Sequence, residues 1–269
     1  ASTLTVAEAG STTFAGTLTG AGGVTKQGTG TLNLTGANTY TGPTSVSGGR
    51  LAINGSITSN VTVGSGGNLG GAGTITGNVN MSGTMAPGNS IGTLSVVGSY
   101  TQAAGSTYQV EANAAGQADR INVTGAPGTA TINGGTVAVL PDASGPYAMS
   151  TTYTILNATG GVSGTFANAT SSLPFLQPSL SYDNNNAYLT LKPGGFARGA
   201  QTTNQAAVGG VLDRSVAGAT GDFATVIGTL ATFPLAQGQA AMDAISGQNY
   251  SGFSTANIGG GLMFMNVLG

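Results

Sequence analysis

Large apolar residues along most of the chain come in pairs two positions apart, with a small or polar residue between them. Side chains at positions i and i+2 of a β-strand point to the same face, so each pair predicts a short strand with one buried face. The pairs are Leu32 and Leu34, Leu51 and Ile53, Val61 and Val63, Val79 and Met81, Leu94 and Val96, Ile121 and Val123, and Val137 and Val139. Leu32 and Leu51 lie 19 residues apart, and Val63 and Met81 lie 18 apart. Units of this length stack into solenoids, so the pattern favours a β-helix, although its period is imperfect.

Gly-Gly and Asn-Gly steps separate the predicted strands of the N-terminal part. They occur at Gly22-Gly23, Gly48-Gly49, Asn54-Gly55, Gly66-Gly67 and Gly70-Gly71. These dipeptides supply the positive φ angles that tight corners require. Thr, Ser and Asn fill the positions between the aliphatic residues, as expected for the hydrated face of a sheet. We therefore expect β-helical rungs over residues 1–84.

Aromatic residues are concentrated in the middle of the chain, which predicts a larger core there. Nine of the sixteen are Tyr100, Tyr108, Tyr147, Tyr153, Phe166, Phe175, Tyr182, Tyr188 and Phe196. Residues 179–182 and 187–191 flank the turn signal Asp183-Asn184-Asn185-Asn186 and predict a hairpin. Because the last rung of a solenoid needs a cap, we expect a β-rich capping subdomain over residues 85–195.

After residue 195 the apolar spacing changes to that of helices. The residues at helical spacing are Val208, Val211, Leu212 and Val216, then Phe223, Val226, Ile227 and Leu230. Thr220 and Asp222 are candidate cap residues, and Pro234 should end the second segment. A third helical piece is expected over 237–246, and the apolar stretch 258–269 is expected to pack with something that follows it. Residues 196–269 are thus predicted to be a helical linker.

Composition narrows the possible functions. The 269 residues include 48 Gly and no Cys, His or Trp, and only 5% are charged. Hydrophobic content of 39% and a mean hydropathy of +0.17 argue against disorder. Without Cys, thiol chemistry and disulfides are excluded. The six Lys and Arg residues are scattered and form no basic stripe, so nucleic-acid binding is not expected. The chain starts without an export-signal pattern, so any signal is expected upstream, and it contains no membrane-spanning apolar run.

Two sequence patterns resemble catalytic sites, but a structural role of their residues explains both patterns better. Gly88-Asn89-Ser90-Ile91-Gly92 matches the GxSxG nucleophile pattern, but the chain has no histidine to serve as a base. Glu111 and Asp119 are expected to lie close together in a rung beside Arg120, which predicts a salt bridge or a solvated edge. The turns lack the aspartates of calcium-binding repeats. We therefore predict no enzyme activity, no catalytic residues, no cofactor and no metal; a polysaccharide-cleaving enzyme is the weakest alternative.

Four segments, taken together and in order, resemble bacterial autotransporter passengers. GTGTLNLTGANTYTGPTSVSGGRLAING (28–55) resembles the autotransporter-associated β-strand repeat. APGNSIGTLSVVGSYTQAAGSTYQVE (86–111) and YTILNATGGVSGTF with LPFLQPSLSYDNNNAYLTL (153–191) resemble the autochaperone or junction region. TTNQAAVGGVLD (202–213) and AMDAISGQNYSGF (241–253) resemble the helical linker that leads to the translocator barrel. The resemblance implies a mainly β fold: a right-handed parallel β-helix with a β-rich C-terminal cap, followed by the linker.

The resemblance also implies a function in type V secretion. The segment would nucleate and stabilise β-helix folding during transport across the outer membrane, and would present the passenger at the cell surface of a Gram-negative bacterium or be secreted with it. Its expected partners are its own outer-membrane barrel, absent from this chain, and the upstream passenger, but no small-molecule substrate. The alternative is an adhesin or self-association surface, with a role in host contact, biofilm or virulence. The residues expected to form the autochaperone turns, core and cap are Pro87, Gly88, Asn89, Ser90, Ile91, Gly92, Leu94, Phe166, Leu173, Pro174, Phe175, Leu176, Pro178, Leu180, Tyr182, Tyr188 and Leu189.

Overall fold

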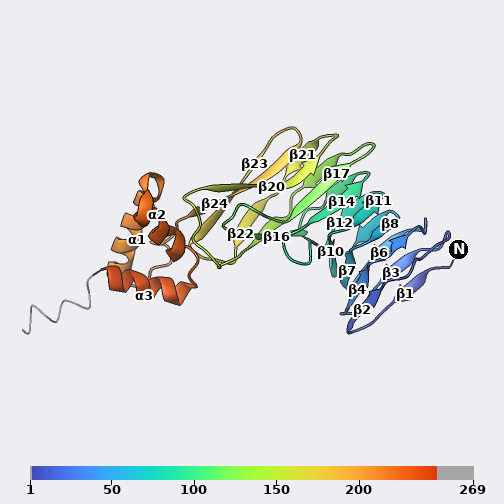
Figure 1. Ribbon diagram of the computed structural model, residues 1–269, viewed down its shortest axis with the longest axis horizontal. Coiled ribbons are helices and arrows are strands. Elements are labelled where there is room, and N and C mark those ends of the chain that lie inside the picture. Colours follow the sequence, from blue (N-terminus) through green and yellow to red (C-terminus); the bar gives the residue numbers. More distant parts are fainter. Residues whose placement is uncertain (1, 247–269) are drawn as a thin grey trace, which may run out of the picture. The chain divides into compact units, whose positions relative to one another are not determined.

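Three stacked sheets of short strands make up most of the computed structural model, which describes residues 2–246 (Figure 1). Residue contacts divide the chain into two units. Within the described residues, the first contains 2–144, 150–172 and 178–191, and the second contains 145–149, 173–177 and 192–246.

Each sheet of the first unit takes one strand from successive turns of the chain. Sheet A contains β1 (Leu4–Val6), β3 (Val24–Lys26), β6 (Thr44–Val46), β9 (Val61–Val63), β12 (Val79–Met81), β15 (Tyr100–Gln102), β18 (Ala130–Asn133) and β21 (Val162–Thr165). Sheet B contains β2 (Ser11–Phe14), β4 (Thr31–Leu34), β7 (Gly49–Ile53), β10 (Gly67–Gly71), β13 (Thr84–Pro87), β16 (Thr107–Ala112), β19 (Thr136–Pro141) and β22 (Asn168–Ser171). Sheet C contains β5 (Ala37–Asn38), β8 (Ser56–Thr58), β11 (Thr74–Thr76), β14 (Thr93–Val97), β17 (Arg120–Thr124), β20 (Thr151–Ala158), β24 (Asn186–Pro193) and β23 (Leu176–Tyr182). The predicted parallel β-helix is confirmed.

Strand register confirms the repeat lengths seen in the sequence. Leu32 pairs with Leu51, and Val63 pairs with Met81. The rungs lengthen toward the C-terminus, because Val61 pairs with Val79, 18 residues on, whereas Tyr100 pairs with Ala130, 30 residues on. The extra residues form loops between strands. The irregular period in the sequence therefore reflects longer rungs, not an interrupted stack.

The core of the first unit consists of columns of inward side chains, one from each rung. In sheet B the column runs through Leu32, Leu51, Leu69, Met85, Tyr108 and Val137. All six side chains are buried, and burial of each large aliphatic side chain stabilises the fold by about 1.5–3 kcal/mol. Tyrosine replaces aliphatic residues where the rungs become longer.

The predicted hairpin is confirmed and ends the parallel stack. β23 and β24 are neighbours in sheet C, and β24 pairs antiparallel with β20 (Figure 1). In the turn, Asp183 Oδ1 accepts hydrogen bonds from the backbone N–H groups of Asn185 (2.8 Å) and Asn186 (2.7 Å). The Tyr188 hydroxyl also donates to Asp183 Oδ2. These hydrogen bonds, that from Tyr188 first, lower the pKa of Asp183 to about 2.

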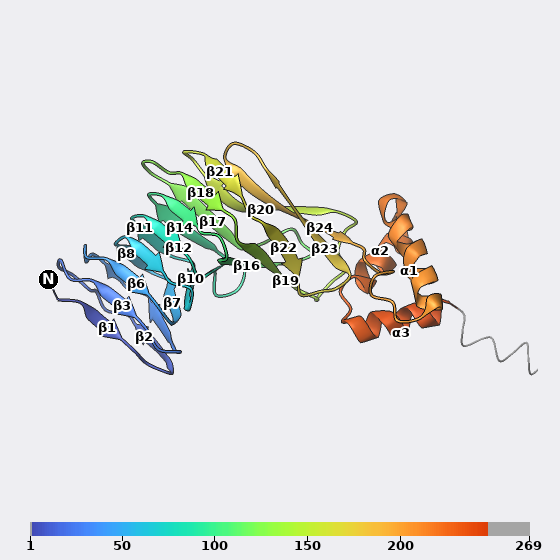
Figure 2. The ribbon, with the colours of Figure 1, turned by 180° about the vertical axis from the view of Figure 1, so that it is seen from behind.

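The predicted subdivision at residues 84 and 195 stays a prediction. All three sheets continue through residue 85, as the run of colours from β1 to β22 shows (Figure 2). By residue contacts, Leu173–Gln177 group with the helical segment.

The second unit contains α1 (Thr203–Ser215), a short 3₁₀ turn (Val216–Gly218), α2 (Gly221–Leu230) and α3 (Leu235–Ile245). The predicted helices are confirmed, but their capping differs in part from expectation. Thr220 is the N-cap residue of α2 without a side-chain hydrogen bond, whereas Thr202 and Gln205 form a capping box on α1. Pro234 lies beyond the end of α2 and precedes α3.

The buried helix faces differ from the apolar pattern in the sequence. Val211, Phe223 and Val226 are about half exposed, whereas Gly209 and Gly228 are buried. A Cβ atom at Gly209 would lie 2.5 Å from the nitrogen of Ala197, and one at Gly228 would lie 2.2 Å from the carbonyl oxygen of Tyr147. The buried faces thus combine predicted apolar residues, Leu212, Ile227 and Leu230, with glycines at which another backbone approaches closely. No helix among residues 2–246 is long and apolar enough to cross a membrane. The stretch 258–269 lies outside the described residues.

Candidate functional site

The loop of residues 88–92 projects between β13 and β14 and contains the GxSxG match. Pro87 ends β13, and Gly88 follows with φ of +78°, a conformation that favours glycine. A Cβ atom at Gly88 would lie 1.9 Å from the carbonyl oxygen of Ser90, so the loop folds back on itself. Asn89 and Ser90 are exposed. The Pro-Gly-Asn-Ser sequence therefore determines this turn locally.

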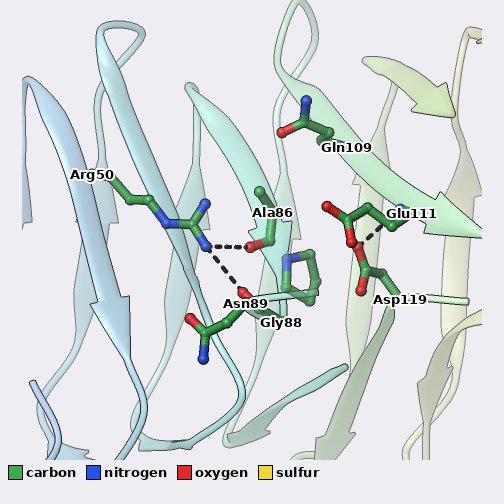
Figure 3. A pocket seen from close by; sticks show the side chains of 8 residues that line it. Arg50, Ala86, Gly88, Asn89, Gln109, Glu111 and Asp119 are labelled. Carbon is green, nitrogen blue, oxygen red and sulfur yellow. Dashed lines mark hydrogen bonds between the residues drawn. The ribbon is translucent and has the colours of Figure 1, made fainter. Parts of the chain in front are cut away.

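Arg50 of β7 holds the start of this loop. Its Nη2 donates to the carbonyl oxygens of Ala86 (3.3 Å) and Gly88 (3.0 Å) (Figure 3). Its Nη1 donates to Asn68 Oδ1 at 3.0 Å. The Gly88 N–H in turn donates to the carbonyl oxygen of Gly71 at 2.9 Å. Burial lowers the pKa of Arg50, and Asp119 and Glu111 oppose this effect. One guanidinium thus connects three successive strands of sheet B.

Asp119 holds the other end of the same loop. Its side chain is 2% exposed, and Oδ1 accepts a hydrogen bond from the Gly92 N–H at 2.8 Å. Oδ2 accepts one from the Glu111 N–H at 2.9 Å (Figure 3). Burial raises the pKa of Asp119 to about 6, although both hydrogen bonds and Arg50 act in the opposite direction. Asp119 thus ties the loop to β16.

An asparagine ladder reaches the tip of the loop from the N-terminal rungs. Asn89 Nδ2 donates to Asn54 Oδ1 at 2.8 Å, and Asn54 Nδ2 donates to Asn33 Oδ1 at 2.7 Å. These residues come from three different turns of the chain. The loop is therefore held by side chains at its start, tip and end.

A pocket of ≈ 320 Å³ lies beside the loop, lined by Arg50, Ala86, Pro87, Gly88, Asn89, Gln109, Glu111 and Asp119. Figure 3 shows the side chains of Glu111 and Asp119 next to each other. The expected closeness of these two residues is confirmed, but the nearby cation is Arg50, because Arg120 is exposed. Both Asp119 oxygens accept backbone hydrogen bonds, so this carboxylate anchors the chain and is poorly placed to transfer a proton.

The GxSxG match lacks the structural context of a nucleophile. That pattern acts at a sharp turn from a strand to a helix, with a base in hydrogen-bond reach of the serine. Here it connects two strands, β13 and β14, and the sequence contains no histidine.

The predicted autochaperone residues fall into three groups. Pro87 to Gly92 form the loop, and Leu94 is fully buried in β14 behind it. Phe166 lies against Tyr108, with ring centroids 5.9 Å apart, and its N–H donates to the Tyr182 hydroxyl at 3.0 Å. Pro178, Leu180, Tyr182, Tyr188 and Leu189 belong to the hairpin, in which Leu189 is fully buried.

The third group, Leu173, Pro174, Phe175 and Leu176, belongs largely to the helical unit. The Phe175 ring stacks on Phe196, with centroids 5.2 Å apart, and contacts the backbone of α3 so closely that a Cβ at Gly238 would lie 2.1 Å from it. Gln177 Nε2 donates to the carbonyl oxygens of Pro174 (2.9 Å) and Gly194 (3.2 Å).

Sequence reasoning missed several residues that hold these sites together. Arg50, Asn54 and Gln177 make contacts with chain segments 16 or more residues away. Arg50 had a detectable signal, since it is a lone charge between uncharged strands of a chain with six basic residues. Asn54 had none, because asparagine is common at turns.

Comparisons with known proteins agree with this architecture. The Passenger-associated-transport-repeat family matches residues 24–53, which run from β3 to the end of β7. An extracellular serine protease of Serratia marcescens is 37% identical over 135 residues, which cover 46% of this chain and 12% of that protein. The chain therefore spans a small part of this relative's length. The repeat match, this relative and the parallel β-helix together support an autotransporter passenger region, and proteins of that class are extracellular or anchored in the outer membrane of Gram-negative bacteria.

Proposed function

We propose that this region nucleates and stabilises folding of the passenger β-helix during secretion and presents the passenger at the cell surface, with residues 85–192 as the folding nucleus. No ATP is available outside the outer membrane, so folding of the emerging chain can bias its movement outward. If the C-terminal rungs emerge and fold first, their open strand edge can template each following rung.

The difference in core composition along the stack supports this proposal. The C-terminal rungs bury Tyr100, Tyr108 and Phe166, and the Tyr108 hydroxyl donates to the carbonyl oxygen of Ile155 at 2.6 Å. Aromatic residues bury more area than Val or Leu and make directional contacts. The N-terminal rungs contain mostly Val, Leu and Ile and many glycines. Local stability should therefore rise toward the C-terminus.

The two ends of the stack also differ. At one end, the hairpin of β23 and β24 covers β20 with an antiparallel strand. At the other end, β1 and β2 are edge strands, and Leu4 and Phe14 are 48% and 36% exposed. An edge with exposed apolar side chains can accept a further strand. In a longer passenger this edge would receive the next rung.

The order of folding can be tested with two matched variants of the whole chain. Leu189 in β24 and Leu69 in β10 are both fully buried, so each Leu→Ala change should destabilise by about 2–5 kcal/mol. If residues 85–192 form the nucleus, Leu189→Ala should slow refolding roughly tenfold or more, whereas Leu69→Ala should mainly accelerate unfolding. Stopped-flow refolding from denaturant measures both rates.

Pulsed hydrogen exchange during refolding provides a second readout. Backbone amides of β14–β20 should gain protection before those of β3–β9. Earlier protection of the N-terminal rungs, or equal slowing of refolding by both variants, would contradict the proposal.

We propose further that the region acts without enzymatic activity of its own. This is supported by the backbone contacts of Asp119 and by the strand-to-strand context of Ser90. The protease activity in the name of the Serratia marcescens relative is that protein's, of whose length this chain covers 12%. A hydrolysis assay of the purified chain on protein and polysaccharide substrates should give no turnover, and turnover lost in Ser90→Ala would contradict this.

A second function, adhesion or self-association, is favoured by one observation. The outward residue at the centre of each sheet A strand is Thr, Ser or Asn in eight consecutive rungs: Thr5, Thr25, Ser45, Thr62, Asn80, Thr101, Thr131 and Ser163. Hydroxyl and amide groups both donate and accept hydrogen bonds. Such an uncharged column could contact a host surface, another cell or another copy of the chain.

This second function is tested by charge substitutions on two faces. Thr62→Lys with Asn80→Lys should abolish adhesion and cell aggregation if sheet A is the contact surface. Thr58→Lys with Thr76→Lys places the same charges on exposed positions of sheet C and serves as the control. Equal effects of both pairs would argue against a specific surface.

A further inference from the structure

Buried polar side chains gather in the rungs that contain residues 24–53. Thr44 lies in a column of sheet A whose neighbouring members are Val24, Val61 and Val79. Lys26 lies in the next inward column, between Val6 and Val46. Thr44 is 1% exposed and Lys26 is fully buried. Polar residues thus interrupt columns that are otherwise aliphatic in these rungs.

Thr44 belongs to a hydrogen-bonded chain between neighbouring rungs. Its Oγ1 lies 2.7 Å from the Tyr40 hydroxyl and 2.8 Å from Ser59 Oγ, and Ser59 Oγ donates to the carbonyl oxygen of Gly42 at 2.7 Å. Tyr40 and Thr44 come from one rung and Ser59 from the next. The chain of hydroxyls is therefore complete only when these two rungs are neighbours.

Asn38 connects three rungs through one buried amide. Its Oδ1 accepts from the Leu18 N–H at 2.9 Å, and its Nδ2 donates to the carbonyl oxygens of Gly36 (3.0 Å) and Ser56 (3.1 Å). Leu18 precedes and Ser56 follows Asn38 by one turn of the helix.

Lys26 places its amino group under a corner of the stack. Its Nζ donates to the carbonyl oxygen of Gln27 at 2.7 Å and lies 3.5 Å from those of Gly28 and Gly48. Gly48 belongs to the following rung. Burial of an amino group costs free energy unless acceptors surround it, so the three carbonyl oxygens of this corner fix the position of the Lys26 amino group.

Aliphatic columns alone specify register weakly. A slip of two residues between neighbouring strands keeps the alternation of faces, and Gly-rich strands with small polar outer residues are prone to such slips. A slip of this kind would break the hydrogen bonds that Lys26, Asn38 and Thr44 make to the neighbouring rungs, which costs free energy for each buried bond lost. Buried polar residues that specify register at little gain, or some loss, of stability are known from coiled coils.

We propose that Lys26, Asn38, Thr44 and Ser59, the register set, select which strand edges pair in these rungs. Their contribution is to the specificity of stacking, not to net stability. The inference does not depend on which end of the β-helix folds first.

Disulfide trapping can distinguish native from slipped register, because the chain has no cysteine of its own. Thr25 pairs with Ser45 in the native register, and neighbouring strands lie about 4.8 Å apart, within disulfide reach. A two-residue slip would pair residue 25 with residue 47 instead. In the native register these two positions are about 8 Å apart, too far for a disulfide. Thr25→Cys is therefore combined with Ser45→Cys in one chain and with Ser47→Cys in another.

The two cysteine pairs are refolded and oxidised in the parent chain, in Thr44→Val, and in Lys26→Met with Thr44→Val. We expect only the 25–45 bond in the parent, and at least a several-fold gain of the 25–47 bond in both variants, with an unchanged or higher denaturant midpoint. Met81→Leu, an apolar exchange in the column of Lys26, is the control and should behave like the parent.

Several outcomes would overturn the proposal. One is exclusive formation of the 25–45 bond in both variants, whatever their stability. Another is failure of both variants to fold, since this would show that the polar groups act through stability. The Thr44→Val change replaces the hydroxyl with a methyl group of similar size and leaves no cavity, so a slip in this variant is not caused by a cavity.

Discussion

The buried side chain of Asp119 joins two segments of the chain. Its carboxylate joins Gly92 to Glu111 and lies near Arg50. Sequence reasoning placed Glu111 and Asp119 together correctly, since they are eight residues apart with a short loop between them. It chose Arg120 as their cation, but successive residues of a strand point to opposite faces, and Arg50 comes from another rung.

The raised pKa of Asp119 predicts a pH dependence of stability. Because its pKa is about 6 in the folded chain against an ordinary 3.8, the folded state binds this proton more tightly than the unfolded state. The free energy of unfolding should therefore gain about 1–3 kcal/mol from this residue as pH falls from 7 to 4. Urea titrations at both pH values give the free energy of unfolding of the parent and of Asp119→Asn. The gain is the pH-dependent change of the parent minus that of the variant. Asp142→Asn, at an exposed site, is the control, and a parent and Asp119→Asn that respond identically to pH would refute the assignment.

At Gly88, the cost of a steric overlap can be separated from the cost of a positive φ angle. Gly88→Ala introduces a Cβ 1.9 Å from the Ser90 carbonyl oxygen at φ of +78°, so we expect a loss of about 3 kcal/mol or more. Gly116 has a similar φ of +87° but open space around its Cβ position, so Gly116→Ala should cost about 1–2 kcal/mol. Denaturant unfolding of both variants measures the difference, and equal losses would show that the loop relaxes.

At the scale of elements, short strands, turns and helices followed from local patterns. Pairs at i and i+2 predicted the strands, and Asp183 to Asn186 predicted the hairpin turn. Helical spacing predicted the helices and the burial of Leu212, Ile227 and Leu230. It did not predict the burial of Gly209 and Gly228, because hydrophobicity does not encode close backbone contacts. The capping box of Thr202 and Gln205 was missed, although its spacing is a helix-start signal.

The hairpin predicts a measurable role for one tyrosine hydroxyl. Tyr182 accepts a hydrogen bond from the buried Phe166 backbone N–H, so Tyr182→Phe should reduce the free energy of unfolding by about 1–3 kcal/mol. The matched change Tyr188→Phe removes a hydroxyl that donates to the exposed Asp183, and should change stability by no more than about 0.5 kcal/mol. Thermal unfolding followed by circular dichroism tests both, and the reverse ranking would contradict the packing described for β23.

At the scale of the whole molecule, contacts separate a β-helical unit from a helical unit. The segment 173–177, which the sequence suggested as part of the β-helix cap, belongs by its contacts to the helical unit. In this segment Phe175 stacks on Phe196 and packs against α3 at Gly238.

This division predicts a variant that affects one unit alone. Phe175→Ala should destabilise the helical unit by about 3–5 kcal/mol. The circular dichroism signal of the helices at 222 nm should therefore be lost at a lower denaturant concentration. Hydrogen exchange in β7 to β16 should stay as in the parent chain. Loss of protection in those strands would show that the two units unfold together. Leu94→Ala, in the core of sheet C, is the control. It should reduce the hydrogen-exchange protection of the strands and leave the helical signal unchanged.

The sequence by itself determined the strand periodicity, the stacking of rungs, the hairpin turn and the change to helices. These features depend on contacts between near neighbours or on a repeating pattern, and both are visible in a linear chain. Only the tertiary structure decided that Arg50 and Asp119 hold the loop of residues 88–92, that Phe175 packs with the helices, and that Lys26, Asn38 and Thr44 bond across rungs. Each of these contacts joins residues brought together by rung length and register, and in a chain of near-equivalent Thr, Asn and Gly positions no local signal specifies the partner.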